Sequence, residues 1–105
     1  MPRNLPSLMV KRIRAVSRPE RIIVFGSAAR GKIGRDSDID VLVVESKARC
    51  TMADSARLRT AIGDVGFPVD VIAIPRRVFD RYRDTVGGVE YAAARHGKVI
   101  YEARR

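Results

Sequence analysis

The fold of this chain is decided by residues 21–45, which read RIIVFGSAARGKIGRDSDIDVLVVE. Residues 21–25 are a short β-branched run, which predicts a buried strand that ends at Gly26. Residues 38–45 predict a second strand. Its side chains alternate between two faces, with Asp38, Asp40, Leu42 and Val44 on one and Ile39, Val41 and Val43 on the other. Because both faces become apolar after the acids, we expect this strand to be central and covered on both sides.

Apolar spacing in the rest of the chain predicts helices and two further strands. The helices are expected over residues 5–18, 51–64, 76–84 and 89–96, and the strands over 69–74 and 99–101. Residues 27–33 are long enough for two helical turns, and residues 34–37 are typical of a loop. If the strands over 38–45 and 69–74 are parallel neighbours, the helix between them is a suitable crossover.

Local signals mark three helix ends. Asn4 can cap the first helix, and Pro6 lies where the first turn tolerates proline. Thr51 and Asp54 predict a capping box at the start of the second helix, with aspartate in place of the usual glutamate. Gly97 directly follows the last helix and predicts a left-handed cap there.

The composition limits the kind of protein this is. With 105 residues, of which 46% are hydrophobic, we expect residues 1–105 to form one small globular domain. Cys50 is the single cysteine and His96 the single histidine, which excludes an intrachain disulfide and a zinc cluster. The longest apolar stretches have the length of strands, so we expect no membrane span and a cytoplasmic location. The net charge of +9 favours anionic partners, although most basic residues are scattered along the chain.

Three aspartates carry the candidate chemistry. Asp38 and Asp40 are two residues apart on one strand, so their carboxylates project from the same face at its beginning. Asp70 lies near the start of a later strand, and the three carboxylates converge if the two strands are parallel neighbours. Like charges this close repel each other unless a cation lies between them, and an incomplete cage of oxygen ligands suits Mg²⁺. Three acids around two metal ions predict a site for phosphoryl chemistry.

A phosphate site is predicted beside these acids. Gly26 and Ser27 follow a strand and open a short helical segment, so their backbone N–H groups can bind an anion, and the Ser27 hydroxyl adds a donor. Arg30, one turn further on, can point at the same anion. For that anion to reach a metal ion on the aspartates, the two strands of residues 21–45 must run antiparallel. The sheet is therefore expected to be mixed rather than purely parallel.

The combination resembles a known family. Taken singly, a Gly-Ser pair is usually a turn and an Asp-x-Asp is usually a solvated loop end, but their conjunction at strand ends is far more specific. Gly26-Ser27, the ten residues 28–37 and then Asp38-Ile39-Asp40 resemble the signature of the minimal nucleotidyltransferases of the DNA polymerase beta superfamily. The third acid of that family starts a later strand, as Asp70 does. The resemblance covers essentially the whole chain. It implies the α+β nucleotidyltransferase fold, with a small mixed sheet of about four strands and helices packed against it.

The resemblance also implies a reaction, in which a nucleoside monophosphate, AMP from ATP, is transferred with loss of pyrophosphate. The three aspartates would bind two Mg²⁺ ions, and Asp70 would also help to deprotonate the acceptor hydroxyl. Gly26 and Ser27 would hold the β- and γ-phosphates of ATP, with support from Arg30. Preference for ATP over other nucleotides comes from the family alone.

The acceptor is expected to be another protein. Minimal relatives of this kind pair with a separate HEPN toxin, act as its antitoxin, and in active members attach AMP to a toxin tyrosine. This implies a protein adenylyltransferase. One alternative is an antitoxin that neutralises its partner by occlusion, and another is a nucleic-acid binder driven by the net charge of +9. The complete set of three acids favours the enzyme, because occlusion alone has no need for clustered carboxylates.

Overall fold

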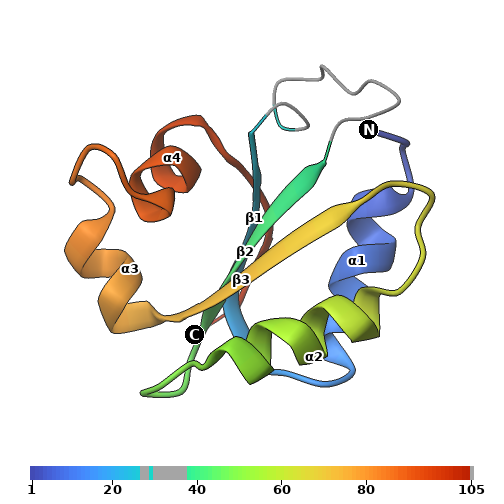
Figure 1. Cartoon of the computed structure of the whole chain (residues 1–105), viewed down its shortest axis with the longest axis horizontal. Helices are drawn as coiled ribbons and strands as arrows, with labels where there is room; N and C mark the ends of the chain where they lie inside the picture. Colours follow the sequence, from blue (N-terminus) through green and yellow to red (C-terminus); the bar gives the residue numbers. More distant parts are fainter. Residues whose placement is uncertain (27–28, 30–37, 105) are drawn as a thin grey trace.

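The computed structural model describes residues 1–26, 29 and 38–104, and it shows one four-stranded sheet with helices on both of its faces (Figure 1). The elements in chain order are α1 (Leu5–Arg14), β1 (Pro19–Phe25), β2 (Ile39–Glu45), α2 (Met52–Ile62), β3 (Val69–Pro75), α3 (Arg76–Tyr82), α4 (Val89–His96) and β4 (Lys98–Glu102). The α+β fold expected from the sequence is confirmed. The turns expected over 27–33 and the loop over 34–37 lie, apart from residue 29, outside the described residues.

The sheet has the strand order β3-β2-β1-β4. β1 pairs antiparallel with both β2 and β4, whereas β2 and β3 are parallel. The antiparallel first pair is as predicted, and the parallel second pair fulfils the condition under which the acids of the two strands converge, so the sheet is mixed as expected. β2 lies between two other strands and is buried from Val41 to Glu45. The parallel pair needs a long connection, which α2 provides.

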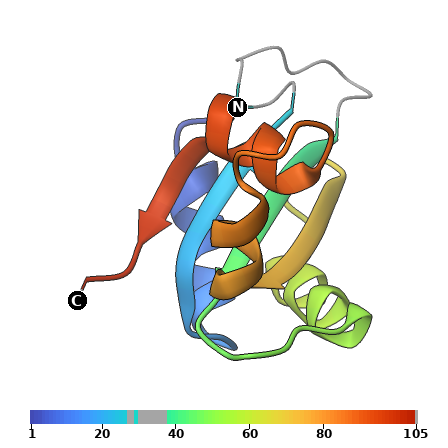
Figure 2. The ribbon, with the colours of Figure 1, turned by 90° about the vertical axis from the view of Figure 1, so that its left-hand side faces the viewer.

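Two apolar clusters fill the space on either side of the sheet. Figure 2 shows the helices that cover them, with α3 and α4 in front of the sheet and α1 behind it. One cluster joins α1 and α2 to one face of β2, through Ile39, Val41 and Val43. The other joins α3 and α4 to the opposite face, through Leu42 and Val44. This is the division of β2 that the alternation predicted. No helix within the described ranges is both long and apolar enough to cross a bilayer.

Two predictions about α1 are wrong, namely its last residue and its side-chain cap. α1 ends at Arg14 rather than at residue 18, because the chain turns towards the sheet, where Ser17 Oγ donates to both carboxylate oxygens of buried Glu45 at 2.7 and 2.8 Å. Asn4 makes no side-chain cap, because its backbone is already helical (φ −88°, ψ −6°), and a capping side chain needs an extended backbone. The N–H group of Leu5 instead donates to the carbonyl of Pro2. The other element ends lie within two residues of their predicted positions.

Thr51 and Asp54 form the predicted capping box, in which each side chain accepts from the other residue's backbone N–H group. Gly97 is not the left-handed cap that its position suggested, because its backbone is extended (φ −81°, ψ 165°). The reason for glycine is close packing. A Cβ atom at Gly97 would overlap the carbonyl oxygen of Ala93 and the side chain of Ile23.

Candidate active site

Asp40 and Asp70 are brought together by the parallel pairing of β2 and β3. The two residues are register partners in that pair. Their side chains lie on the face of the sheet that also carries Leu42 and Ile72, because alternate residues of a strand share a face. Asp70 is exposed and Asp40 is half-buried, so the pair opens to solvent on the β3 side.

Asp40 is half-buried and lies among negative charges. Partial burial raises the pKa of Asp40 above its usual value, and the negative charges of Asp70 and Asp38 raise that pKa further. Asp38 directly precedes β2 and is exposed. In the described part of the chain, no lysine or arginine forms an ion pair with any of these three carboxylates. The site therefore concentrates negative charge that no described basic side chain offsets.

Gly26 lies directly against this charge. Phe25, the last residue of β1, is the register partner of Asp40, which places the following glycine beside the start of β2. The backbone of Gly26 is left-handed (φ +75°), and a Cβ atom there would overlap Oδ2 of Asp40. Glycine is thus required both by the turn and by the close approach of the backbone to the carboxylate. Ser27 and Arg30, the other predicted phosphate ligands, lie outside the described residues, and their contacts stay predictions.

The donor set fits a hard divalent cation. All candidate ligands are carboxylate oxygens, and the two register partners lie side by side. Within residues 1–26, 29 and 38–104, however, no three His, Cys, Asp or Glu side chains form a group able to hold a metal ion. The aspartates therefore interact through their charges without forming a complete protein cage. Such an incomplete set of oxygen ligands suits Mg²⁺, which keeps several waters and takes further ligands from substrate phosphates.

An open pocket of about 490 Å³ adjoins Asp40 and Asp70. Its lining comes from five elements or their ends and comprises Phe25, Asp40, Ser55, Ala56, Arg59, Asp70, Val71, Ile72 and Val89. Sequence analysis missed Arg59, which α2 places at this pocket. Nothing in the local sequence distinguishes it among the 21 basic residues, and only the crossover geometry brings it near the acids.

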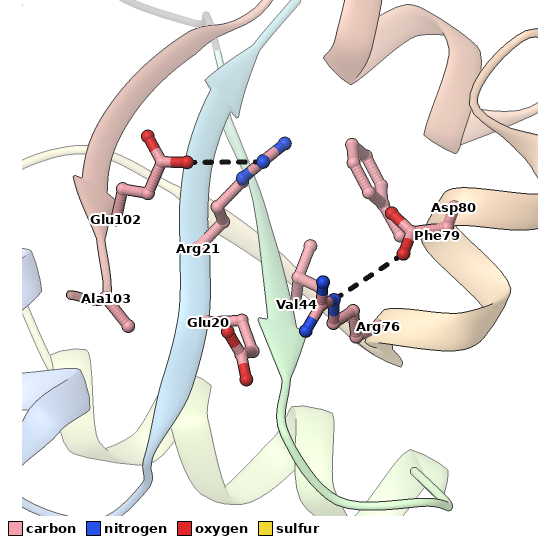
Figure 3. Close-up of a pocket in the computed structure, with 8 residues that line it drawn as sticks. All are labelled: Glu20, Arg21, Val44, Arg76, Phe79, Asp80, Glu102 and Ala103. Atoms are coloured by element: carbon pink, nitrogen blue, oxygen red, sulfur yellow. Dashed lines mark ion pairs between the residues drawn. The ribbon is translucent and has the colours of Figure 1, made fainter. Parts of the chain in front are cut away.

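A second pocket, of about 310 Å³, lies at the opposite end of the sheet (Figure 3). Two arginines line it, and both are paired with carboxylates, Arg21 with Glu102 at 3.2 Å and Arg76 with Asp80 at 3.5 Å. Its arginines therefore present no unpaired positive charge. The pocket beside Asp40 and Asp70 is the better candidate for a reaction centre.

The comparison with known families agrees with this geometry. A family model described as a nucleotidyltransferase domain matches residues 9–98. The chain belongs to the nucleotidyltransferase domain family. The matched part of this nucleotidyltransferase domain includes Gly26, Asp38, Asp40 and Asp70. No curated protein matches the chain in sequence.

Two solved structures share the fold of this nucleotidyltransferase domain. A crystal structure described as that of a candidate nucleotidyltransferase from Sulfolobus solfataricus has a TM-score of 0.62 at 20% identity, covering 94% of this chain and 81% of that chain. The crystal structure of a toxin-antitoxin with AMP-PNP has a TM-score of 0.60 at 19% identity, covering 94% of this chain and 74% of that chain.

Proposed function

We propose that this nucleotidyltransferase domain transfers AMP from ATP to a hydroxyl group of a separate protein, and that it acts in this way as the antitoxin of an HEPN-type toxin. The observation that carries the proposal is the placement of Asp40 and Asp70 as register partners, with Gly26 against Asp40, in a member of this family. The structural similarity to a toxin-antitoxin with AMP-PNP supports the proposal that ATP is the donor and that the domain acts as an antitoxin.

The proposed reaction is an in-line displacement at the α-phosphorus of ATP. The acceptor oxygen forms a bond to that phosphorus while the bond to the bridging oxygen of the β-phosphate breaks. Pyrophosphate leaves with the electron pair, and Asp70, which is exposed and beside Asp40, accepts the hydroxyl proton. Mg²⁺, when bound by the aspartates, neutralises charge on the transferring phosphate.

The remaining site residues hold the nucleotide in place. The glycine at position 26 lets backbone N–H groups come close to the phosphates, and Ser27 and Arg30 add a hydroxyl and a positive charge to the same anion. Asp38 and Asp40 supply carboxylate oxygens at the start of β2. The raised pKa of Asp40 means that its ionised form is poorly stabilised in the free domain, which favours binding of a cation there.

The rival to this proposal is a domain whose nucleotide site is an inactive relic. In that case the domain would neutralise its partner by binding and occlusion, without turnover.

The test uses labelled ATP, MgCl₂ and the protein encoded by the neighbouring gene. We expect the wild type to transfer label to that protein, and we expect Asp38→Ala/Asp40→Ala to transfer none. Neutralisation of the partner is then scored in cells. A double variant that still neutralises, together with an unlabelled partner, would establish occlusion and overturn the enzyme. Wild type and double variant that differ in label but not in partner binding would support the enzyme.

A further inference from the structure

The outer edge of β3 leads into the candidate active site. β3 is the last strand of the sheet and pairs only with β2 (Figure 1). The N–H group of Ile39 donates to the carbonyl of Pro68 at 2.8 Å, so the backbone of Pro68 faces β2. Backbone groups alternate in direction along a strand, which turns those of Val69, Val71 and Ala73 outward, away from β2.

Only part of this edge is covered. The outward N–H group of Ala73 donates to Ser55 Oγ on α2 at 3.0 Å. In the described part of the chain, no side chain makes a corresponding hydrogen bond to Val69 or Val71. These two residues lie at the end of β3 that holds Asp70. The stretch of the edge without such a hydrogen bond is therefore the stretch nearest the candidate active site.

Two adjoining pockets lie along this stretch. The pocket beside the two acids shares Ala56 and Arg59 with a second pocket of about 460 Å³. The second pocket is lined by Ala56, Arg59, Thr60, Gly63, Phe67, Pro68 and Val69. We call the two pockets together the β3 groove. Val71, which is partly exposed, lines its active-site end, and Val69, which is 6% exposed, lines its outer end.

Arg59 is the single basic residue in the described lining of the groove, which also contains the carboxylates of Asp40 and Asp70 at its active-site end. Arg59 is exposed, and within the described ranges it forms no ion pair. Arg57, two residues earlier on the same helix, pairs with Asp54 at 3.7 Å and does not line the groove. A carboxylate of a bound segment would complement Arg59.

We propose that the β3 groove docks an extended segment of the acceptor protein that carries a carboxylate for Arg59, and so determines which hydroxyl is modified. The segment lies beside Val69 and Val71, bonds to their outward backbone groups, places a carboxylate on Arg59 and delivers its hydroxyl to Asp70. Edge-strand addition of this kind takes affinity from the backbone and specificity from alternate side chains. The inference rests on the proposed function, since it names the acceptor's contact with that same site.

Two variants test the groove, each with a matched control on α2. Arg59→Ala removes the groove charge, and Arg57→Ala removes an arginine outside it. Ala56→Gln fills the groove with a long neutral side chain, and Ala53→Gln adds the same side chain at an exposed position that does not line it. Melting curves establish that all four variants fold. Binding of the neighbouring gene's product is measured without nucleotide, and binding of a non-hydrolysable ATP analogue with Mg²⁺ is measured separately.

We expect both groove variants to bind the partner about tenfold more weakly, Arg59→Ala because it loses a charged hydrogen bond and Ala56→Gln because its side chain occupies the groove. Their affinity for the ATP analogue and both controls should match the wild type. Groove variants that bind the partner normally would overturn the inference, and so would a selective loss of analogue binding, which would assign the groove to the nucleotide. If the wild type binds the partner through the groove but transfers no label, the proposed function fails and the docking site stands.

Discussion

Asp40 and Asp70 are register partners on the parallel strands β2 and β3, and the charge of Asp70 raises the pKa of Asp40. This repulsion, together with partial burial, disfavours the ionised form of Asp40 in the folded domain. The ionised side chain therefore opposes folding at neutral pH as long as no cation is bound. The pairing of Asp40 with Asp70 therefore lowers the stability of the metal-free domain at the site where we propose that catalysis occurs.

Asp40→Asn should separate stability from activity. In EDTA at pH 7, the variant should be as stable as the wild type or more stable, measured by urea unfolding, because the amide removes the repulsion. As the pH falls through the raised pKa of Asp40, this side chain becomes protonated in the wild type, and any difference in unfolding free energy in favour of the variant should disappear. Transfer of AMP should fall about a thousandfold, since a bound metal ion supplies several kcal/mol of transition-state stabilisation. A variant clearly less stable than the wild type in EDTA would mean that Asp40 makes a stabilising contact.

Gly26→Ala should disturb Asp40 directly. The left-handed backbone at this position costs a residue with a side chain about 1–2 kcal/mol, and the new Cβ would also overlap Asp40 Oδ2. Gly66→Ala is the matched control, because Gly66 has φ +87° but no atom within 4 Å of its Cβ position. Both variants should lose stability in urea unfolding, but only Gly26→Ala should also lose transfer activity, by at least about tenfold. Equal activity in the two variants would contradict the close approach to Asp40.

The capping box of α2 should make stability depend on acid pH. The hydrogen bond from Lys47 and that from the Thr51 backbone lower the pKa of Asp54 from 3.8 to about 2. Asp54 therefore contributes stability fully above pH 3.8, and this contribution is lost as the pH falls towards 2. The difference in unfolding free energy between wild type and Asp54→Asn should shrink over that range in a pH series of urea titrations. A difference that stays constant with pH would show that the charge of Asp54 has no part in it.

Gly97→Ala should destabilise the domain through packing rather than through backbone conformation. Its φ of −81° suits any residue, but the new methyl group would overlap Ala93 O and Ile23 in the second apolar cluster. Overpacking of this kind costs about 1–3 kcal/mol. Gly88→Ala also has a negative φ, and its Cβ would meet only the mobile end of Glu90, so that variant should stay close to wild type. Thermal melts that rank the two variants in the opposite order would refute this account.

The regular elements followed from patterns that act over a few residues. The β-branched run before Gly26 and the alternation after Asp38 predicted β1 and β2 because burial on one or both faces imposes a period of two. Thr51 and Asp54 predicted their capping box because both partners lie within one helical turn. The predictions for Asn4 and Gly97 were wrong because they too used only neighbouring residues. Each fits a local rule, but the chain at Asn4 is already helical, and Gly97 is required by contact with a distant strand.

The spacing of the glycine, serine and aspartates in the sequence was enough to propose a metal-dependent phosphate-transfer site. It also required the first two strands to be antiparallel, because the phosphate ligands and the acids must lie at neighbouring strand ends. Only the tertiary structure decided that Asp40 and Asp70 are register partners and that Arg59 lines their pocket. It also decided that Ser55 bonds to the edge of β3 at Ala73. Those facts depend on how α2 crosses from β2 to β3. The path of α2 is determined by many weak packing contacts between distant residues, so it cannot be predicted from a short stretch of sequence.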